Sequence, residues 1–133
     1  MIALRTSSVR NAMLASVPVI TPRTTVATAL RLLREHDVTA LPVSDGERFL
    51  GLVDEKALLR LTPSDVTTLD VYELRDVLDR LTVARVVEPV HSISSEASLD
   101  EAAARMRAER HEVLPVVDGG RVVGLLSWTA LLQ

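Results

Sequence analysis

Cysteine is absent from this chain of 133 residues, which excludes thiol catalysis, thiolate metal sites and a disulfide scaffold. Aromatic residues are rare: Phe49, Tyr72 and Trp128 make up 2% of the chain, too few for a base-stacking platform. No apolar run approaches the roughly 20 residues of a membrane span, and the first ten residues lack the apolar core of a signal peptide. These absences favour a soluble, cytoplasmic protein with no membrane contact.

Charged residues are plentiful and mixed in sign. The chain has 18 acidic and 15 basic residues, with a formal net charge of −3, and 14 of the 15 basic residues are arginine. An acidic balance of this kind argues against a nucleic-acid partner. With 47% hydrophobic and 25% charged residues, the composition is that of an ordinary globular protein, and the length suits one compact module.

An internal repeat is the strongest signal in the sequence. When the chain is shifted by 73 residues, residues 25–59 align with residues 98–132 without a gap, and 13 of the 35 pairs are identical. The identities cluster in the block Leu41-Pro42-Val43-x-Asp45-Gly46, which recurs as Leu114-Pro115-Val116-x-Asp118-Gly119. The chain therefore consists of two copies of one unit.

Each copy predicts the same order of elements. Apolar side chains at the spacing of one helix face predict a first helix, with Thr24 or Thr25 and Ser98 as N-cap residues. Two apolar runs around an Asp-Gly step then predict a β-hairpin. A short extended segment precedes the first helix and a second short helix follows the hairpin, so the unit is β-α-β-β-α. The two copies place these elements at 19–20 and 92–93, 26–33 and 99–106, 40–53 and 113–126, and 55–61 and 128–132.

One such unit has a single small sheet and would leave an apolar face of it uncovered. We therefore expect an α+β fold in which two pseudo-symmetric units pack sheet against sheet. Asp70 and Glu73 form a capping box for a connecting helix, and residues 9–14 and 83–87 are predicted as short lead-in helices. The predicted organisation is one module over 1–133, with a first motif at 9–61, a linker at 62–81 and a second motif at 82–133.

Each copy resembles a CBS motif (the name comes from cystathionine β-synthase), and the tandem resembles a CBS pair, or Bateman module. The resemblance covers residues 9–132, and its most specific parts are the repeated Leu-Pro-Val-x-Asp block and the Gly51-Leu52 and Gly124-Leu125 steps. It implies a regulatory module that senses a small and commonly adenosine-containing molecule in a cleft between the motifs. It also implies a homodimer, with a regulated enzyme or transporter as a partner in trans. Because the sequence shows no nucleophile–base pair, metal-ligand set or glycine-rich phosphate loop, we do not expect an enzyme.

The resemblance places ligand contacts where the last strand of each copy ends. The family pattern there is Gly-apolar-x-Ser/Thr-x-x-Asp, in which the hydroxyl faces phosphate or ribose and the acid holds the ribose hydroxyls. The second copy has Ser127 and Thr129, with Ala130 in place of the acid, whereas the first copy has Asp54 and Ala57. Asp54 and Ser127 also fit the simpler role of helix caps. As cofactor, an adenine nucleotide is therefore expected to bind weakly, with residual binding at Ser127.

The turn after the first helix of each copy is the second place where the resemblance implies ligand contact. It offers apolar walls, one hydroxyl and one carboxylate, and the nearest cations, Lys56 and Arg110, are interpreted as solvated surface. The complete set of predicted ligand-binding residues is Val38, Thr39, Ala40, Glu112, Val113, Ser127, Thr129, Ala130, Asp54 and Ala57.

The histidines and the turn aspartates are interpreted structurally. The spacing of His36, His91 and His111 matches no compact metal-ligand set, so we predict no metal site and no catalytic site. Asp45 and Asp118 lie where a hairpin turn favours aspartate, and we interpret them as turn formers.

Two glycines interrupt the second strand of each hairpin. Gly51 and Gly124 indicate either a close backbone approach or a bulge at these points.

Two hypotheses for function remain open from the sequence. The first is a ligand sensor, which Ser127 and Thr129 favour. The second is a ligand-free dimerisation or protein-interaction module with degenerate clefts, which Ala57 and Ala130 favour.

Overall fold

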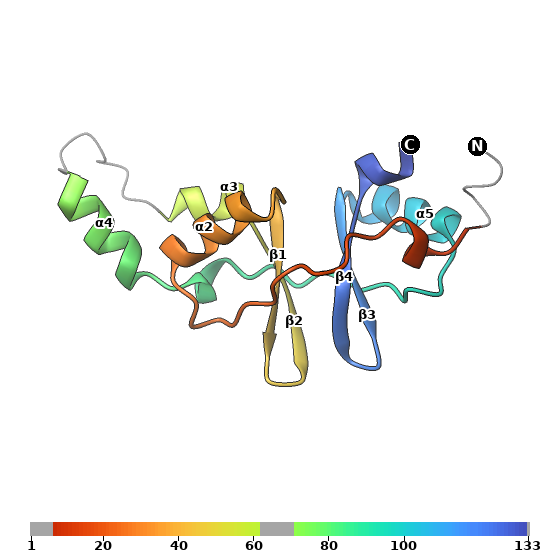
Figure 1. The fold of residues 1–133 in the computed structure, drawn as a ribbon, viewed down its shortest axis with the longest axis horizontal. Coiled ribbons are helices and arrows are strands. Elements are labelled where there is room, and N and C mark those ends of the chain that lie inside the picture. Colours follow the sequence, from red (N-terminus) through yellow and green to blue (C-terminus); the bar gives the residue numbers. More distant parts are fainter. Residues whose placement is uncertain (1–6, 62–70, 133) are drawn as a thin grey trace.

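The computed structural model describes residues 7–61 and 71–132, and these form two halves that repeat the same elements (Figure 1). The first half contains α2 (Val26–Glu35), β1 (Ala40–Asp45), β2 (Arg48–Asp54) and α3 (Glu55–Arg60). The second half contains α5 (Leu99–Glu109), β3 (Val113–Asp118), β4 (Arg121–Ser127) and the 3₁₀ helix η4 (Trp128–Leu132). The remaining elements are the 3₁₀ helices η1 (Val9–Asn11) and η3 (Val83–Val86), and helix α4 (Val71–Arg80).

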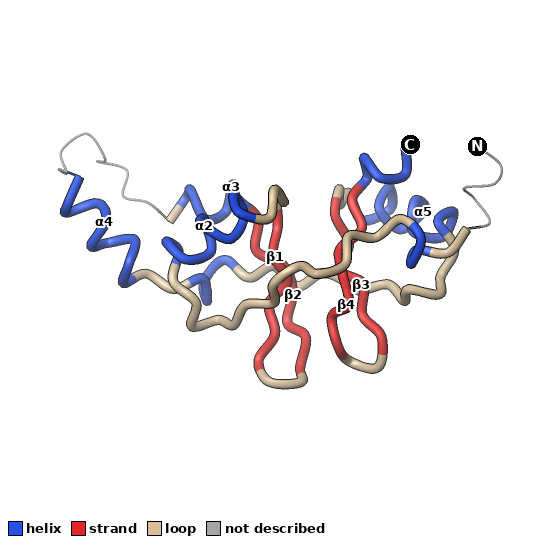
Figure 2. The backbone as a smooth tube through the Cα atoms, viewed as in Figure 1, coloured by secondary structure: helices blue, strands red, loops and turns tan. Residues whose placement is uncertain are grey.

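The two hairpins stand next to each other in the middle of the molecule, and the helices lie outside them (Figures 1 and 2). Each half has its own apolar core beneath its hairpin. Between the hairpins, Ala40, Leu52 and Leu125 form a small buried cluster that both halves share. This arrangement confirms the expected α+β fold, with two units packed through their sheets.

The first helix of each half forms where its apolar face and its cap predict it. In α2 the apolar face is buried through Val26, Ala29 and Leu33, and the Thr25 hydroxyl accepts a hydrogen bond from the Thr28 N–H at 3.1 Å. In α5 the Ser98 hydroxyl accepts from the Glu101 N–H at 3.0 Å. Capping of this kind satisfies a backbone donor that the first helical turn leaves free.

The hairpins are antiparallel, and each contains one irregularity at the same place. The register shifts between Val43 and Ser44 in the first hairpin and between Val116 and Val117 in the second. A third segment adds a parallel bridge on the other side of each first strand, from Ile20 to Val43 in the first half. The second half repeats this bridge between Ile93 and Val116.

The lead-in segments cross over to the opposite halves. Val9 of η1 is buried in the core of the second half, and Val83 of η3 is buried in the core of the first. After η1, Leu14 forms an antiparallel bridge with Leu125 on β4.

The other lead-in crosses in the same way, since Glu88 pairs with Leu52 on β2 through hydrogen bonds of 2.8 and 2.9 Å. Both lead-in elements were expected as short helices, and both are short 3₁₀ helices, η1 over Val9–Asn11 and η3 over Val83–Val86.

The crossing explains the paired glycines. A Cβ at Gly124 would lie 2.6 Å from the Leu14 carbonyl oxygen, and one at Gly51 would overlap the Glu88 carbonyl. Each glycine also lies beside the bulge of its hairpin. Both expected features are therefore present, and the close approach serves the packing of the lead-in backbone against the sheet.

Helix α4 packs against α2, where Leu78 and the following Leu81 contact the first core. The predicted cap Asp70 lies outside the described residues. In the part of the chain that the structure describes, no helix has both the length and the apolar character needed to cross a membrane.

Candidate functional site

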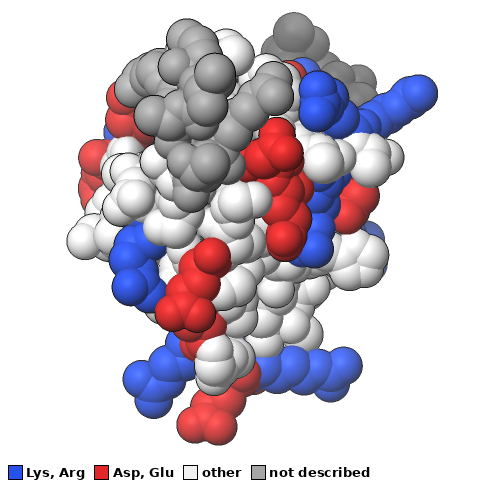
Figure 3. Space-filling view, turned by 90° about the vertical axis from the view of Figure 1, so that its right-hand side faces the viewer, with Lys and Arg blue, Asp and Glu red and all other residues white. Residues whose placement is uncertain are grey.

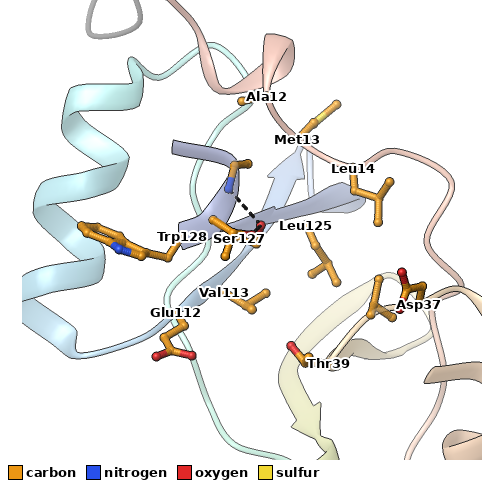
Figure 4. A pocket seen from close by; sticks show the side chains of 14 residues that line it. Ala12, Met13, Leu14, Asp37, Thr39, Glu112, Val113, Leu125, Ser127 and Trp128 are labelled. Atoms are coloured by element: carbon orange, nitrogen blue, oxygen red, sulfur yellow. Dashed lines mark hydrogen bonds between the residues drawn. The ribbon is translucent and has the colours of Figure 1, made fainter. Parts of the chain in front are cut away.

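Two clefts lie between the halves, at positions related by the internal repeat. The first, which we call the Ser127 cleft, has a volume of about 530 Å³. Its walls come from both halves and from the segment after η1 (Figure 4). The lining residues are Ala12, Met13, Leu14, Asp37, Val38, Thr39, Ala40, Glu112, Val113, Leu125, Ser127, Trp128, Thr129 and Ala130.

The turn from β4 into η4 carries the hydroxyls of this cleft. Ser127 Oγ accepts a hydrogen bond from the Ala130 N–H at 3.3 Å and lies 3.0 Å from Thr129 Oγ1. The Trp128 N–H donates to the Glu112 carbonyl at 2.7 Å, which ties this turn to the start of β3. The expected second helix of this half is therefore a single 3₁₀ segment, and Ser127 is both its cap and a cleft residue.

The structure brings most of the predicted site residues together. The set Val38, Thr39, Ala40, Glu112, Val113, Ser127, Thr129 and Ala130 lines the Ser127 cleft, whereas Asp54 lines the second cleft and Ala57 lines neither. Sequence reasoning missed Met13, Leu14 and Asp37 among the residues of the Ser127 cleft. The glycine at position 124 was the available signal for the first two, because it marks the strand that Leu14 approaches.

The second cleft, which we call the Asp54 cleft, has a volume of about 550 Å³ and contains many more charged side chains. Asp54 Oδ1 accepts a hydrogen bond from the Ala57 N–H at 2.7 Å, and the Glu55 N–H donates to the Thr39 carbonyl at 3.1 Å. The carboxylate thus serves as the cap of α3. The lining residues are Thr39, Ala40, Leu52, Asp54, Glu55, Lys56, Glu88, Val90, Glu109, Arg110, His111, Glu112 and Val113.

Cations are present in the Asp54 cleft, where Lys56 and Arg110 face four carboxylates in addition to Asp54. Arg110 has a left-handed backbone at the end of α5, and Asp37 has the same conformation at the equivalent position of the first half. The same turn geometry therefore presents an acid to one cleft and a base to the other.

The three histidines lie apart. His36 is the C-cap residue of α2, His111 lines the Asp54 cleft, and exposed His91 contacts Glu109 through Nδ1 at 3.2 Å. Among residues 7–61 and 71–132, no three histidine or carboxylate side chains come together as a metal-binding group.

Asp118 does more than form a turn. Its carboxylate accepts hydrogen bonds from the Ser95 hydroxyl at 2.5 Å and the Ser95 N–H at 3.0 Å, and the Arg10 guanidinium donates to the same hydroxyl. The bonds from Ser95 hold the pKa of Asp118 below its usual value. Asp118 thereby joins the η1 segment, the segment before α5 and the second hairpin, a role that the turn interpretation did not anticipate.

The charges on the outer face of the second half show no patch of one sign. Figure 3 shows basic and acidic side chains interspersed over this face. The basic side chains visible in this view therefore lie among acidic ones.

Comparison with protein families gives two matches within this chain. The model of the CBS domain family matches residues 9–64 and 74–133. The chain is 27% identical over 121 residues to the CBS domain-containing protein YhcV of Bacillus subtilis, covering 91% of this chain and 80% of that protein. It is 28% identical over 121 residues to homoserine O-acetyltransferase of Methanosphaerula palustris, of which it spans 22%.

Solved structures show the same architecture. The CBS domain of a CBS domain-containing membrane protein from Sphaerobacter thermophilus superposes with a TM-score of 0.82 at 24% identity, covering 98% of this chain and 88% of that one. CBSX2, solved in complex with AMP, superposes with a TM-score of 0.71 at 28% identity, covering 94% and 93%. From the two family matches and the repeated architecture, we conclude that this chain belongs to the CBS domain family and carries two copies of the domain.

Proposed function

We propose that this CBS pair is a cytoplasmic regulatory module that binds a small metabolite in the Ser127 cleft and changes its shape or association on binding. The observation that carries the proposal is the lining of this cleft by both halves. A ligand there contacts Thr39 of the first half and Ser127 of the second, so its affinity depends on how the halves are placed. Differential affinity for two arrangements is what a ligand needs to shift a protein between them.

An adenosine-containing compound is the ligand class that the relatives support. CBSX2, which is 28% identical, was solved in complex with AMP. In this chain the hydroxyls of Ser127 and Thr129 remain, while Ala130 supplies no acceptor for ribose hydroxyls. We therefore propose a ligand that relies on the hydroxyls and apolar walls and binds without a ribose-holding acid.

A metabolite screen by thermal shift tests this proposal. A ligand at 100 times its dissociation constant adds about 2.7 kcal/mol, which raises the midpoint of a domain of this size by several degrees. Thr129→Phe fills the Ser127 cleft and is expected to abolish the shift. Lys56→Phe, at the equivalent position of the other cleft, is the matched control and is expected to preserve it. A shift that survives Thr129→Phe would contradict the assignment, as would a screen without hits.

The second candidate function is a protein-interaction module, with the chain as a homodimer and a regulated enzyme or transporter as partner. Large apolar side chains on the surface favour it, including Leu59, which is 51% exposed, and Leu132, which is 65% exposed. Leu32 is half-buried and packs against the first core. A mass near 14.5 kDa by light scattering at tens of micromolar would contradict the homodimer.

A further inference from the structure

We propose that the Ser127 cleft selects a small organic ligand without negative charge, either uncharged or a protonated amine, and disfavours phosphorylated compounds. The inference rests on the proposed function of this cleft and specifies the ligand class.

The charges that line the Ser127 cleft are all negative. Asp37 and Glu112 are its ionisable residues, and both side chains are exposed at its rim. Neither lysine, arginine nor histidine occurs among its lining residues. Two unit charges about 8 Å apart in water change an affinity by a factor of about two, and a dianionic phosphate facing two carboxylates multiplies that effect. An anionic group entering this cleft therefore meets repulsion, and no cationic side chain is among the described residues that line it.

Two backbone donors of the adjoining turn are already used within the chain. The Trp128 N–H is bonded to the Glu112 carbonyl, and the Ala130 N–H is bonded to Ser127 Oγ. These are two of the first three N–H groups of η4. A phosphate that accepts from either of these two N–H groups would have to displace its bond, whereas an uncharged ligand that contacts the hydroxyls leaves both in place.

The remaining surface of the cleft suits an uncharged body. Met13 and Leu14 form one wall and Leu125 the floor beside it, as the side chains in Figure 4 show. The hydroxyls of Ser127 and Thr129 can each donate or accept, because either oxygen can supply the proton between them. The cleft thus combines apolar contact with neutral polar partners, which is typical of sites for small uncharged ligands.

The Asp54 cleft shows that the absence of cations is particular to the Ser127 cleft and not a property of the fold. At the position equivalent to Asp37, the second half has Arg110, and at the position equivalent to Thr129 the first half has Lys56. Both cations line the Asp54 cleft. These two differences between the copies leave the Asp54 cleft with two cations and the Ser127 cleft with none among its lining residues.

Three probes that differ at one atom position test the inference: adenosine, AMP and 5′-amino-5′-deoxyadenosine, which carry a hydroxyl, a phosphate and a protonated amine. Trp128 is the sole tryptophan of the chain and lines the cleft, so its indole N–H gives a single NMR signal at the site. We expect adenosine and the amine to shift this signal, with AMP weaker than adenosine by at least about tenfold, or about 1.4 kcal/mol.

The double variant Asp37→Asn/Glu112→Gln tests the cause. Asparagine tolerates the left-handed backbone of position 37, and the Glu112 carbonyl that holds Trp128 is unchanged. We expect the AMP deficit to fall to about threefold and the amine to lose about threefold in affinity. Asp79→Asn on α4, which lines neither cleft, is expected to keep the native ratios.

The outcomes separate this inference from the proposed function. AMP binding as tightly as adenosine would overturn the inference and leave the proposed function standing. Native ratios in the double variant would overturn the charge mechanism. Failure of all three probes to move the Trp128 signal would contradict both this inference and an adenosine-type ligand, whereas a hit from the metabolite screen would still support the sensor.

Discussion

The two hairpin tips of this molecule have the same sequence pattern but different surroundings. Asp118 in the second half accepts hydrogen bonds from fully buried Ser95, while Asp45 in the first half makes a loose ion pair with Arg23 at 3.7 Å. The residue equivalent to Ser95 is Pro22, which has no donor to offer. The difference between Pro22 and Ser95, which lies outside the hairpin, therefore gives Asp118 hydrogen bonds to the neighbouring segment that Asp45 cannot form with Pro22.

The clefts differ in the same manner. Ser127 and Asp54 are equivalent, and each caps the helix that follows it. The acid adds a negative charge to its cleft, whereas the hydroxyl leaves its cleft with neutral donors and acceptors. The repeat places equivalent residues at both clefts, and their side chains differ in charge.

The largest expected effect comes from charging the core of either half. Leu41 and Leu114 are equivalent and fully buried, so Leu41→Asp or Leu114→Asp is expected to cost at least about 4 kcal/mol and to prevent folding of the whole module. Pro42→Ala, one residue away, is expected to change stability by about 1 kcal/mol or less. Urea denaturation followed by circular dichroism measures both. Equal losses for Leu41→Asp and Pro42→Ala would show that the core assignment is wrong.

The next effect concerns the two crossings. Gly51→Ala and Gly124→Ala are each expected to cost about 2–4 kcal/mol, because the added methyl group meets the carbonyl of Glu88 or Leu14. Gly51→Ala is expected to be the worse, since backbone atoms alone surround it and the Met13 side chain beside Gly124 can move. Gly46→Ala, which has free space in its turn, serves as control at about 1 kcal/mol. A harmless Gly51→Ala would contradict the crossing.

Aspartate substitutions at the equivalent positions 130 and 57 are expected to affect adenosine affinity differently. Ala130→Asp adds an acceptor for two ribose hydroxyls in the Ser127 cleft, and we expect it to strengthen adenosine binding about ten- to a hundredfold. Ala57→Asp is expected to give no gain, because Ala57 does not line the Asp54 cleft. Calorimetric titration of both variants measures the difference. If only Ala57→Asp strengthened adenosine binding, the ligand site would belong to the Asp54 cleft and not to the Ser127 cleft.

The smallest expected effect is the acid sensitivity of the second hairpin. The pKa of Asp118 is lowered in the folded protein by its bonds from Ser95, so its contribution to stability is complete above the usual carboxyl pKa and is lost as the pH falls through the lowered value. Asp118→Asn should therefore lower the thermal midpoint at neutral pH and flatten its decline as the pH falls below the usual carboxyl pKa. Asp45→Asn changes the equivalent residue of the first hairpin and is the matched comparison. Identical profiles for the two variants would remove the distinction between the hairpin tips.

Local pattern was sufficient for much of the fold and part of the site. The helix faces of 26–33 and 99–106, their caps Thr25 and Ser98, and the Asp-Gly turns all act over a few residues, and each is present as predicted. The family pattern led to Ser127 and Thr129 in the same way. The 3₁₀ form of η4 was not predicted, because a run of five residues does not itself choose between two helical geometries.

The sequence by itself determined that this protein is a duplicated β-α-β-β-α unit, because apolar spacing, caps and turn residues specify local conformation. Only the tertiary structure decided that Val9 is buried in the second core and Val83 in the first, since those contacts join residues far apart in the chain. The same crossing brings Met13 and Leu14 to the cleft of Ser127, and the packing of the two halves adds Asp37 and Glu112 to the lining of that cleft. The lining of a cleft comes from several segments of the chain, so its net charge depends on which segments the tertiary packing brings together.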